Sequence, residues 1–336
     1  MQKSVSTIVC HHRGLLVDKA IDSLRKSLEV DCEIIVATSC LESERRLKEK
    51  YAECKIFYCE GGPARKRNVA TRFASHDFIA FFDDDVEVTP YAVFYLVEAI
   101  NNSGIGMAYG KLLNLEFQNK FDEAGSFLTW SGFLFARCES GIEDNGQFEK
   151  ACPILSGKSA SCIVRRKVFW MVGGFDESFE ILGEETDLSW RIWLRGFDVM
   201  FCPKSVTYHA FNTKFKPADM YIPRRIYFNG ARNYLSMLMT NLEYKNLIIP
   251  IFVQMIVWFS ASMGFIITGK LEPGLYIIKG ILSFLTHLPT ILKKRKIVQF
   301  SRIVSDKELL PQITFNPPWS YYAKRFVKYI RTGRHG

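Results

Sequence analysis

The 336-residue sequence predicts an α/β domain with a mainly parallel sheet, followed by a helical, membrane-associated C-terminal segment. Three observations lead to this fold class. Short apolar runs alternate with amphipathic segments over the first hundred residues, which is the pattern of βαβ units. Residues 247–268 contain no charged side chain, and the residues from 293 onward are strongly basic. A hydrophobic fraction of 48% and a mean hydropathy of +0.00 are high for a water-soluble enzyme.

The first hundred residues predict four strands, each followed by a helix. The strands are expected at 4–10, 32–38, 55–59 and 77–83, and the helices at 15–28, 41–51, 61–75 and 90–100. Gly-Gly-Pro opens the third helix and a proline opens the fourth, where a helix tolerates a missing N–H. Right-handed crossovers place the carboxyl ends of parallel strands on one edge, so the loops after the strands should gather there. These loops are 10–14, 38–41, 60–64 and 83–89.

The middle of the chain is richer in strands. Strands are expected at 107–117, 158–164 and 198–203, with an exposed loop at 139–150. One clear helix, 183–196, opens with acidic residues and stops at Gly196. Nine cysteines occur without a Cys-x-x-Cys pair, which predicts reduced thiols in a cytoplasmic domain.

The net charge of +9 is confined to the C-terminus. Residues 293–336 contain eleven Lys and Arg against two acids, so residues 1–292 are formally neutral. A basic segment next to an apolar one favours an anionic membrane surface as the partner, with no role for nucleic acid.

Two apolar segments precede the basic tail. Residues 247–268 run for about the ~20 residues that a membrane-spanning helix needs. Residues 275–292 are a weaker candidate, because they contain Lys279 and His287. Positive charge at both outer ends predicts a hairpin in the cytoplasmic membrane, with the preceding domain facing the cytoplasm. A pair of interfacial or core helices is the alternative. The predicted segments are a linking helix at 216–245, a hydrophobic helical hairpin at 246–292 and a basic C-terminal tail at 293–336.

Three consecutive acids, Asp83, Asp84 and Asp85, directly follow the fourth strand. Their mutual repulsion is costly unless cations or hydrogen-bond donors offset it. At the carboxyl end of a strand in an open α/β sheet, where ligands bind, such a turn is typical of a hard-cation site. The alternative is a solvated turn in which an Asp caps the next helix.

Three separated blocks resemble one known family. They are STIVCHHRG at 6–14, GGPARKRNVATRFASHDFIAFFDDDVEVTP at 61–90 and GGFDESFEILGEETDLSWRIWLRGFDV at 173–199. In order and spacing they are similar to the family-2 glycosyltransferases of the GT-A fold, over roughly residues 4–210. The resemblance implies an inverting, metal-dependent transferase that uses a nucleotide-activated sugar. Its catalytic domain would be 1–215, with a nucleotide-binding half at 1–100 and an acceptor-binding half at 101–215.

The resemblance also assigns roles to the acidic turn. In the family's Asp-x-Asp pattern Asp85 matches the metal ligand, while Asp83 and Asp84 match residues that hold the ribose or a sugar hydroxyl. Mn²⁺ or Mg²⁺ bound there would stabilise the departing diphosphate as a Lewis acid. His209 matches a further metal ligand, although a lone histidine is more often a core residue.

The donor site is expected to use the first two loops and the third helix. His11 and Arg13 lie in the first loop, and Thr38 lies in the second, where the chain departs from the family's Asp-x-x-Ser pattern. Arg67 matches a phosphate-binding arginine, and Asn68 helps to shape the base pocket. Residues 65 and 67 cannot share one helix face, so at least one of these two arginines is expected to be solvated. A plain run of surface charge is the alternative for this basic stretch.

Inversion requires a carboxylate that accepts the proton of the acceptor hydroxyl as its oxygen attacks the anomeric carbon. The family has Glu-Asp-x-Asp here, and this chain has Glu184, Glu185, Thr186 and Asp187. Glu185 occupies the position of the family's base aspartate, and both Glu184 and Glu185 stay open as the base. All three acids, Asp187 included, also suit a helix N-terminus by the dipole alone.

Together these features predict transfer of a sugar from a nucleotide-diphosphate donor to a hydroxyl of a lipid-linked or envelope-glycan acceptor. A non-catalytic, membrane-docked protein that binds a sugar nucleotide is the alternative. The charges at Asp85 and at Glu184 and Glu185 favour the enzyme, because a chain that had lost its activity would relax such costly groups.

Overall fold

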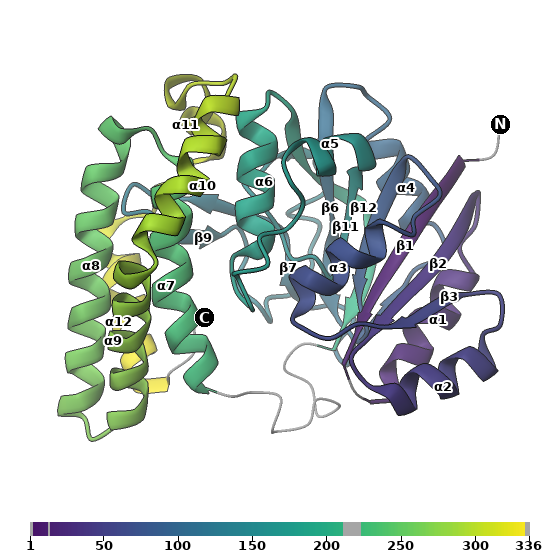
Figure 1. Cartoon of the computed structure of the whole chain (residues 1–336), viewed down its shortest axis with the longest axis horizontal. Helices are drawn as coiled ribbons and strands as arrows, with labels where there is room; N and C mark the ends of the chain where they lie inside the picture. Colours follow the sequence, from purple (N-terminus) through teal and green to yellow (C-terminus); the bar gives the residue numbers. More distant parts are fainter. Residues whose placement is uncertain (1–2, 13, 211–222, 333–336) are drawn as a thin grey trace.

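The computed structural model describes residues 3–12, 14–210 and 223–332. An α/β domain with a ten-stranded sheet occupies one side of the molecule, and C-terminal helices pack together on the other (Figure 1). The strand order is β10-β12-β6-β11-β4-β1-β2-β3, with β5 paired to β12 and β7 to β6.

The N-terminal part follows the predicted alternation of strands and helices. Its elements are β1 (Lys3–His11), α1 (Leu16–Arg25), β2 (Val30–Thr38), α2 (Leu41–Lys50), β3 (Lys55–Tyr58), α3 (Pro63–Thr71), β4 (Phe78–Asp83), β5 (Val86–Val88) and α4 (Ala92–Ala99). The neighbouring strands β3, β2, β1 and β4 are all parallel, so their carboxyl ends share one edge. Gly61 has a φ of +109°, and a Cβ on Gly62 would lie 3.0 Å from the Glu180 carbonyl oxygen, which explains the glycine pair before Pro63.

The middle of the chain makes the sheet mixed. Its elements are β6 (Ile105–Asn114), β7 (Phe121–Glu123), β8 (Ser126–Leu128), β9 (Leu134–Ala136), β10 (Cys152–Pro153), β11 (Ser161–Arg165), α5 (Arg166–Met171), α6 (Glu184–Leu194) and β12 (Asp198–His209). β11 lies between β4 and β6 and is antiparallel to both, while β12 is parallel to β6. The expectation of a mainly parallel sheet is therefore wrong for this half. Loops and short strands lead into β11 instead of a crossover helix, and an apolar run carries no sign of its direction.

Side chains of the central strands alternate between two cores, one on each face of the sheet. Ile8 and Phe81 point to the face that α3, α5 and α6 cover, whereas Val9 and Phe82 point to the face that α1, α2 and α4 cover. All four side chains are fully buried. Burial on both faces explains why these strands appear in the sequence as continuous apolar runs. All nine cysteines are free, as expected.

The C-terminal third is largely helical. Its elements are α7 (Pro223–Asn241), α8 (Tyr244–Ile267), α9 (Leu271–Thr286), α10 (Leu288–Ser301), α11 (Asp306–Ile313) and α12 (Trp319–Thr332). Helices α7, α8, α9 and α12 share a core that includes Tyr227, Trp258, Phe265, Ile277 and Tyr329. The basic segment expected as a tail is therefore built of packed helices, because apolar residues between its cations give these helices buried faces. The predicted boundary at 215 lies outside the described residues.

The two apolar segments differ in the structure. Helix α8 is long and apolar enough to cross a membrane, with a mean hydropathy of 1.9. The second predicted segment is divided between α9 and α10, which meet at a bend of 62° around His287. Pro289, near the start of α10, removes a backbone donor at this break. By length and composition, the bent pair would also pass as one broken span.

A buried ionic contact joins the α/β domain to the C-terminal helices. Asp187 of α6 is fully buried, and its Oδ2 lies 2.7 Å from Arg191 Nη2 and 3.1 Å from Lys294 Nζ of α10. The Asn241 amide of α7 donates to Asp187 Oδ1 at 3.0 Å. Burial raises the pKa of Asp187, but Arg191, Lys294 and Asn241 outweigh burial and lower it to about 2.

We expect Asp187→Ala to lower the free energy of unfolding by about 3–5 kcal/mol, because Arg191 and Lys294 lose a buried partner. Urea denaturation of the purified chain measures this loss. Asp22→Ala is the control, since Asp22 pairs with Arg25 on the surface at 3.8 Å. That change should cost less than about 1 kcal/mol. An equally small cost for Asp187→Ala would show that the contact does not join the two parts.

The contribution of Asp187 to stability also predicts how the wild-type chain and Asp187→Ala respond to acid. The contribution of Asp187 is complete above its unfolded-state pKa of 3.8 and is lost as the pH falls through the folded value of about 2. The wild-type chain should therefore lose more stability than Asp187→Ala when the pH is lowered from about 5 to about 2. Parallel losses in the two chains would remove Asp187 from the acid response.

Candidate functional site

Predicted site residues from separate parts of the chain meet at the carboxyl edge of the sheet. β1 ends at His11, β2 at Thr38 and β4 at Asp83. The strand register pairs His11 with Thr38. β12 ends at His209, which pairs with Val86 of β5, directly after the acidic turn. The topology therefore brings the first two loops, the acidic turn and the end of β12 to one place.

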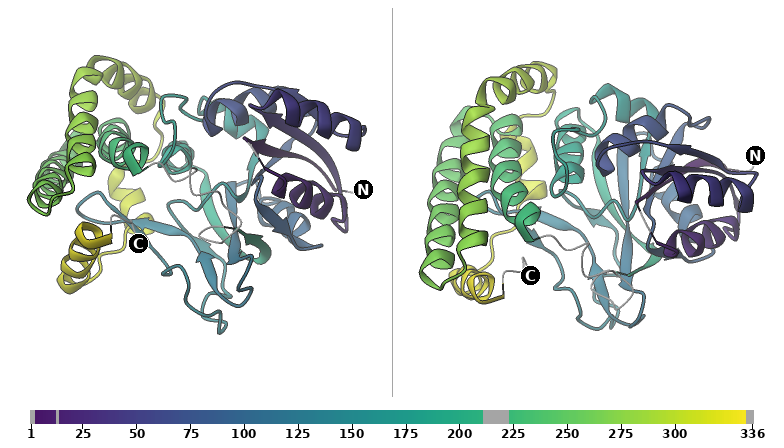
Figure 2. Two further views of the ribbon diagram at one scale, coloured as in Figure 1. Left: turned by 90° about the horizontal axis from the view of Figure 1, so that it is seen from below. Right: turned by 60° about the horizontal axis from the view of Figure 1, so that its bottom comes forward.

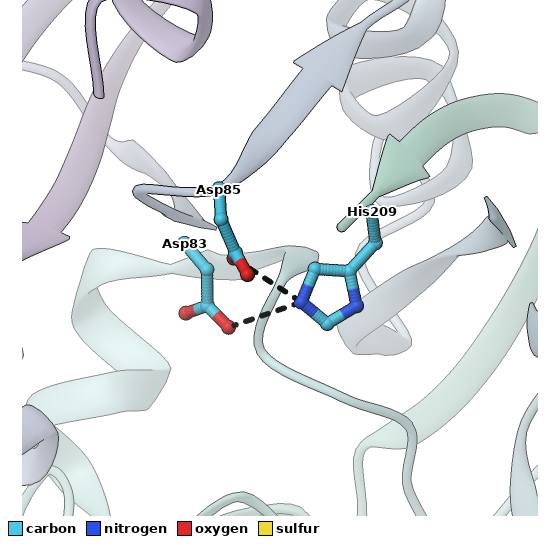
Figure 3. A group of neighbouring side chains, drawn as sticks. All are labelled: Asp83, Asp85 and His209. Atoms are coloured by element: carbon cyan, nitrogen blue, oxygen red, sulfur yellow. Dashed lines mark ion pairs between the residues drawn. The ribbon is translucent and has the colours of Figure 1, made fainter. Parts of the chain in front are cut away.

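Asp83, Asp85 and His209 point toward one another (Figure 3). One ligand atom of each lies within 4.8 Å of the others. His209 Nε2 is 3.2 Å from Asp85 Oδ1 and 4.0 Å from Asp83 Oδ2. Two carboxylates and an imidazole in this arrangement can hold a divalent cation such as Mn²⁺ or Mg²⁺.

A buried carboxylate orients His209 from its other side. His209 Nδ1 lies 2.8 Å from Asp122 Oδ2, which leaves Nε2 directed at the acidic turn. Lys158 donates to the second oxygen of Asp122 at 2.7 Å. Burial raises the pKa of Asp122, but Lys158 and His209 outweigh burial and lower it. Carboxylate–histidine pairs of this kind fix the ring and the tautomer of metal-binding histidines.

The charge state of His209 follows from its neighbours. Burial lowers the pKa of His209, but Asp85 and Asp122 outweigh burial and raise it to about 9. The two carboxylates therefore stabilise the protonated form of the ring. A cation that binds Nε2 has to displace this proton, because only the neutral imidazole is a ligand.

Asp84 binds the first loop of the protein. Its Oδ2 lies 2.7 Å from His11 Nδ1 and accepts from the His12 backbone N–H at 3.2 Å. Thr38 acts in a similarly local way, since its hydroxyl accepts from the Cys40 backbone N–H at 3.1 Å. These polar groups shape the two loops at the carboxyl ends of β1 and β2.

Arg67 bridges two acidic groups of the site. Its Nη2 donates to Asp83 Oδ1 at 2.8 Å, and its Nη1 lies 3.4 Å from Glu184 Oε1. Burial lowers the pKa of Arg67, but its acidic neighbours, led by Asp83, outweigh burial and raise it. The alternative of a surface charge is therefore wrong for Arg67, which is 3% exposed. Its charge is engaged by carboxylates of the protein.

The residues before Arg67 on α3 have different surroundings. The Arg65 side chain is 59% exposed, as expected from the helical spacing of residues 65 and 67. Lys66 is buried and donates to the His11 carbonyl oxygen at 2.8 Å. Burial lowers the pKa of Lys66. Arg13, predicted as a donor-binding residue, lies outside the part of the chain that the structure describes.

Asn68 holds a loop of the protein. Its Nδ2 donates to the Phe175 carbonyl oxygen at 2.9 Å, and the Phe175 N–H donates back to Oδ1 at 2.9 Å. Gly174 has a φ of +68°, and a Cβ there would lie 2.7 Å from the same amide oxygen. Both ends of the amide are committed to this loop, so the role of Asn68 in a base pocket is not supported.

The two glutamates at the start of α6 differ in their surroundings. Glu184 uses one oxygen in the contact with Arg67. The Oε2 atoms of Glu184 and Glu185 are both buried and have no hydrogen-bond partner among the described residues. Burial and the charge of Glu184 raise the pKa of Glu185 well above its usual range. A carboxyl group with a raised pKa and an unpaired oxygen has the properties of a general base.

The turn before α6 is held by α7. Leu182 and Gly183 have φ angles of +67° and +90°, and such a conformation at Leu182 costs on the order of 1 kcal/mol. Asn233 of α7 donates through Nδ2 to the carbonyl oxygens of Ile181 and Leu182, at 2.9 and 2.8 Å. Helix α7 therefore fixes the turn from which the two glutamates project.

Asp187 has a different task from the glutamates. Both of its oxygens are bound within the contact between α6, α7 and α10. The predicted catalytic role of Asp187 is therefore not supported.

Sequence reasoning missed Asp122, Lys158 and Asn233. None of these lies in the three blocks that carry the family resemblance. Asp122 belongs to a strand of three residues, and its only signal is an acid in a segment that is otherwise buried. A buried acid requires a cation, but sequence spacing does not reveal that the cation is Lys158.

Comparison with known proteins identifies one matching protein family. Residues 7–172 match the model of Glycosyl transferase family 2. The O-antigen biosynthesis protein RfbC of Myxococcus xanthus is 32% identical over 139 residues, which cover 40% of this chain and 11% of RfbC. The Pre-mycofactocin glycosyltransferase of Mycobacterium tuberculosis is 24% identical over 177 residues, which cover 51% of this chain and 34% of that protein. The matches thus span a minor part of either relative.

Solved structures share the fold. The structure of S. aureus TarS 1–349 in complex with UDP-GlcNAc has 18% identity and a TM-score of 0.57, and the match covers 98% of this chain and 92% of that chain. The structure of GalNAc-T7 with UDP, GalNAc and Mn²⁺ has 14% identity and a TM-score of 0.56, with coverage of 87% and 57%. These likenesses establish a GT-A-like α/β fold with a mixed central sheet and flanking helices.

Proposed function

Residues 7–172 form a glycosyl transferase family 2 domain, and from this premise we propose that the chain transfers a sugar from a nucleotide-diphosphate donor to a hydroxyl group, with inversion at the anomeric carbon. The observation that carries the proposal is the meeting of two groups at one edge of the sheet. Arg67 contacts Asp83 of the cation-binding cluster and Glu184, which directly precedes the proposed base Glu185, so the cluster and the two glutamates at the start of α6 lie beside the same arginine.

Asp83, Asp85 and His209 are the proposed holders of Mn²⁺ or Mg²⁺. When bound, the cation supplies Lewis-acid stabilisation of the negative charge that develops on the departing diphosphate. The fit rests on the donor set, two carboxylates and one imidazole, and on the orientation of His209 by Asp122. The GalNAc-T7 structure contains Mn²⁺ together with UDP, which supports this assignment.

Glu185 is the proposed general base. It accepts the hydroxyl proton while the acceptor oxygen forms a bond to the anomeric carbon and the bond from that carbon to the diphosphate oxygen breaks. Glu184 is the weaker choice, because one of its oxygens is engaged by Arg67. Arg67 holds the acidic turn and the start of α6 together, so that base and cation site keep a constant geometry.

The donor and the acceptor are proposed from the neighbours and from the loops. The TarS and GalNAc-T7 structures carry UDP or UDP-GlcNAc, so a uridine diphosphate sugar is the first donor to test. Its nucleotide would lie over the loops that His11, Thr38 and Asp84 shape. RfbC is named as an O-antigen biosynthesis protein. Together with the apolar helix α8, that name supports a lipid-linked or envelope-glycan acceptor at the cytoplasmic face of a membrane.

The first test concerns the cation. UDP-sugars are first screened for Mn²⁺-dependent thermal stabilisation, because a ligand that binds the folded state raises its stability. With the donor found, Asp85→Asn should lower UDP release by at least about 100-fold, since the loss of a ligand weakens stabilisation of the leaving group by several kcal/mol. EDTA should have the same effect on the wild-type chain, and Mn²⁺ or Mg²⁺ should reverse it. Turnover at the wild-type level in Asp85→Asn would exclude a cation at this cluster.

The second test concerns the base. Glu185→Gln keeps the shape of the side chain but cannot accept a proton, so kcat should fall by about 10²–10⁴. The Kd of the donor should change little, because the cation ligands are intact. Glu184→Gln is the matched control and should lower kcat less. If only Glu184→Gln loses turnover, Glu184 is the base instead of Glu185. Full turnover in both variants would refute a carboxylate base at this motif.

The third test concerns Asp122. Asp122→Ala should lower the affinity for Mn²⁺ by about 10–100-fold, because the His209 ring loses its fixed orientation. The free Mn²⁺ signal in electron paramagnetic resonance measures this without donor or turnover. Asp144→Ala is the control, since Asp144 is an acid paired with Lys111 at 2.9 Å in the exposed 139–150 loop. Equal Mn²⁺ affinity in Asp122→Ala and the control would remove Asp122 from the metal site.

A further inference from the structure

Helices α8 and α9 carry a broad apolar surface that no part of the described chain covers. They lie at the edge of the molecule farthest from β1 to β3 in every view (Figure 1, Figure 2). The exposed apolar residues are Ile248, Ile249, Phe252, Ile256, Phe259 and Ile267 on α8 and Leu271, Leu275, Leu282 and Leu285 on α9. On α8 their exposure ranges from 50% at Ile256 to 83% at Ile267. We name this surface the outer apolar face, and its size marks it as an interaction site.

We propose that the outer apolar face rests on a bilayer of anionic lipid, with α8 and α9 lying in the plane of the membrane and not crossing it. This inference deepens the proposed function, since it assigns the surface and the orientation by which the enzyme meets its membrane. A helix of this kind buries its apolar side about 5–10 Å deep at the boundary between headgroups and acyl chains.

The inner sides of both helices are committed to the protein. The buried residues of α8 recur every three or four positions and include Gln254 and Ser262, both fully buried. Ser262 donates to the Gly274 carbonyl oxygen of α9 at 2.8 Å. A Cβ on Gly280 of α9 would overlap the Phe228 carbonyl oxygen of α7, so α7 and α9 are in direct backbone contact. The two apolar helices cannot enter a bilayer without α7.

Helix α7 is in turn bound to the α/β domain by polar groups. Arg232 donates to the Ser178 carbonyl oxygen at 2.6 Å, and Asn233 donates to the turn before α6. Arg225 pairs with Glu180 at 3.3 Å. A crossing α8–α9 hairpin would take these charges and part of the α/β domain into hydrocarbon, which costs several kcal/mol for each charged group. The packing therefore favours docking in the plane over crossing.

Positive charge completes the match to an anionic bilayer. Residues 244–301, from α8 to α10, contain seven Lys and Arg and one acid, Glu272. Lys294 and Arg295 are bound to protein groups, Lys294 by Asp176 and Asp187. Exposed cations in this region include Lys279, Lys293 and Lys296. Long cationic side chains beside an apolar surface reach lipid phosphates while their stems stay in the interface, and a protein partner offers no such layer of anions.

Binding to vesicles tests the surface. Wild-type protein should float with vesicles that contain one third phosphatidylglycerol in phosphatidylcholine, and less with pure phosphatidylcholine. Phe259→Glu should weaken binding by at least about tenfold, because one aromatic side chain is lost from the buried area and a charge is gained. Phe73→Glu on the α/β domain is the control, since Phe73 is 53% exposed and Phe259 is 56% exposed. Circular dichroism checks that both variants fold.

Three results would overturn the proposal. One is equal vesicle binding by Phe259→Glu and Phe73→Glu. Another is a wild-type dimer in size-exclusion chromatography that Phe259→Glu dissociates while vesicle binding stays unchanged, since the face would then be a protein interface. The last is absence of vesicle binding by the wild-type chain. None of these measurements uses turnover, so they remain readable even if the proposed sugar transfer is not found.

Protease access tests the orientation. A protease recognition sequence is inserted after Gly269, in the exposed turn between α8 and α9. Membrane vesicles with the cytoplasmic face outward are prepared from cells that express the full chain. Helices in the plane leave the turn on the outer side, and added protease should cut it without detergent. A crossing hairpin would place the turn inside the vesicle, so cleavage only after detergent would refute docking in the plane.

Discussion

Compensation of buried negative charge at the carboxyl edge of the sheet is the constraint on which the site depends. Arg67 from α3 sits between Asp83 and Glu184, and His209 from β12 contacts Asp85. The contacts of Arg67 with Glu184 and of His209 with Asp85 join segments that are far apart in the sequence. Removing one partner of such a pair leaves an uncompensated buried charge, which costs several kcal/mol. The same contacts therefore fix the geometry of the site and hold the two halves of the α/β domain together.

Helix α7 connects the site to the C-terminal helices, again through polar contacts. Asn241 binds Asp187 on one turn of α6, and Asn233 holds the turn before α6. The two asparagines are eight residues apart, which is slightly more than two helical turns, so they lie on similar sides of α7. Phe228 and Ala231 of α7 pack against Gly280 of α9. A C-terminal segment that the sequence presents as a membrane anchor is thus also part of the support of the proposed base.

The sequence predicted local structure well and partners poorly, for a physical reason. Periodicity and turn residues report what each segment does by itself, and they located β1 to β4 and α1 to α4. They missed the three-residue strand β5, which lies in the loop predicted at 83–89. The direction of β11 depends on its neighbours β4 and β6, which periodicity cannot encode. The contacts of Asn68 and Asp187 could not be predicted for the same reason. The amide of Asn68 is bound by Phe175 and the carboxylate of Asp187 by Lys294, and sequence spacing reveals neither contact.

Rigid contacts connect the outer apolar face to the proposed base. Helix α9 packs on α7 through Gly280 with no room for a Cβ, and α7 holds the turn before Glu185 through Asn233. A protein docked through α8 and α9 therefore carries Glu185 at a fixed distance from the bilayer. An acceptor anchored in that bilayer reaches the base by diffusion in two dimensions, with its hydroxyl at a height set by its own linker. A soluble glycan gains nothing from this arrangement, so the proposed docking agrees with the proposed lipid-linked acceptor.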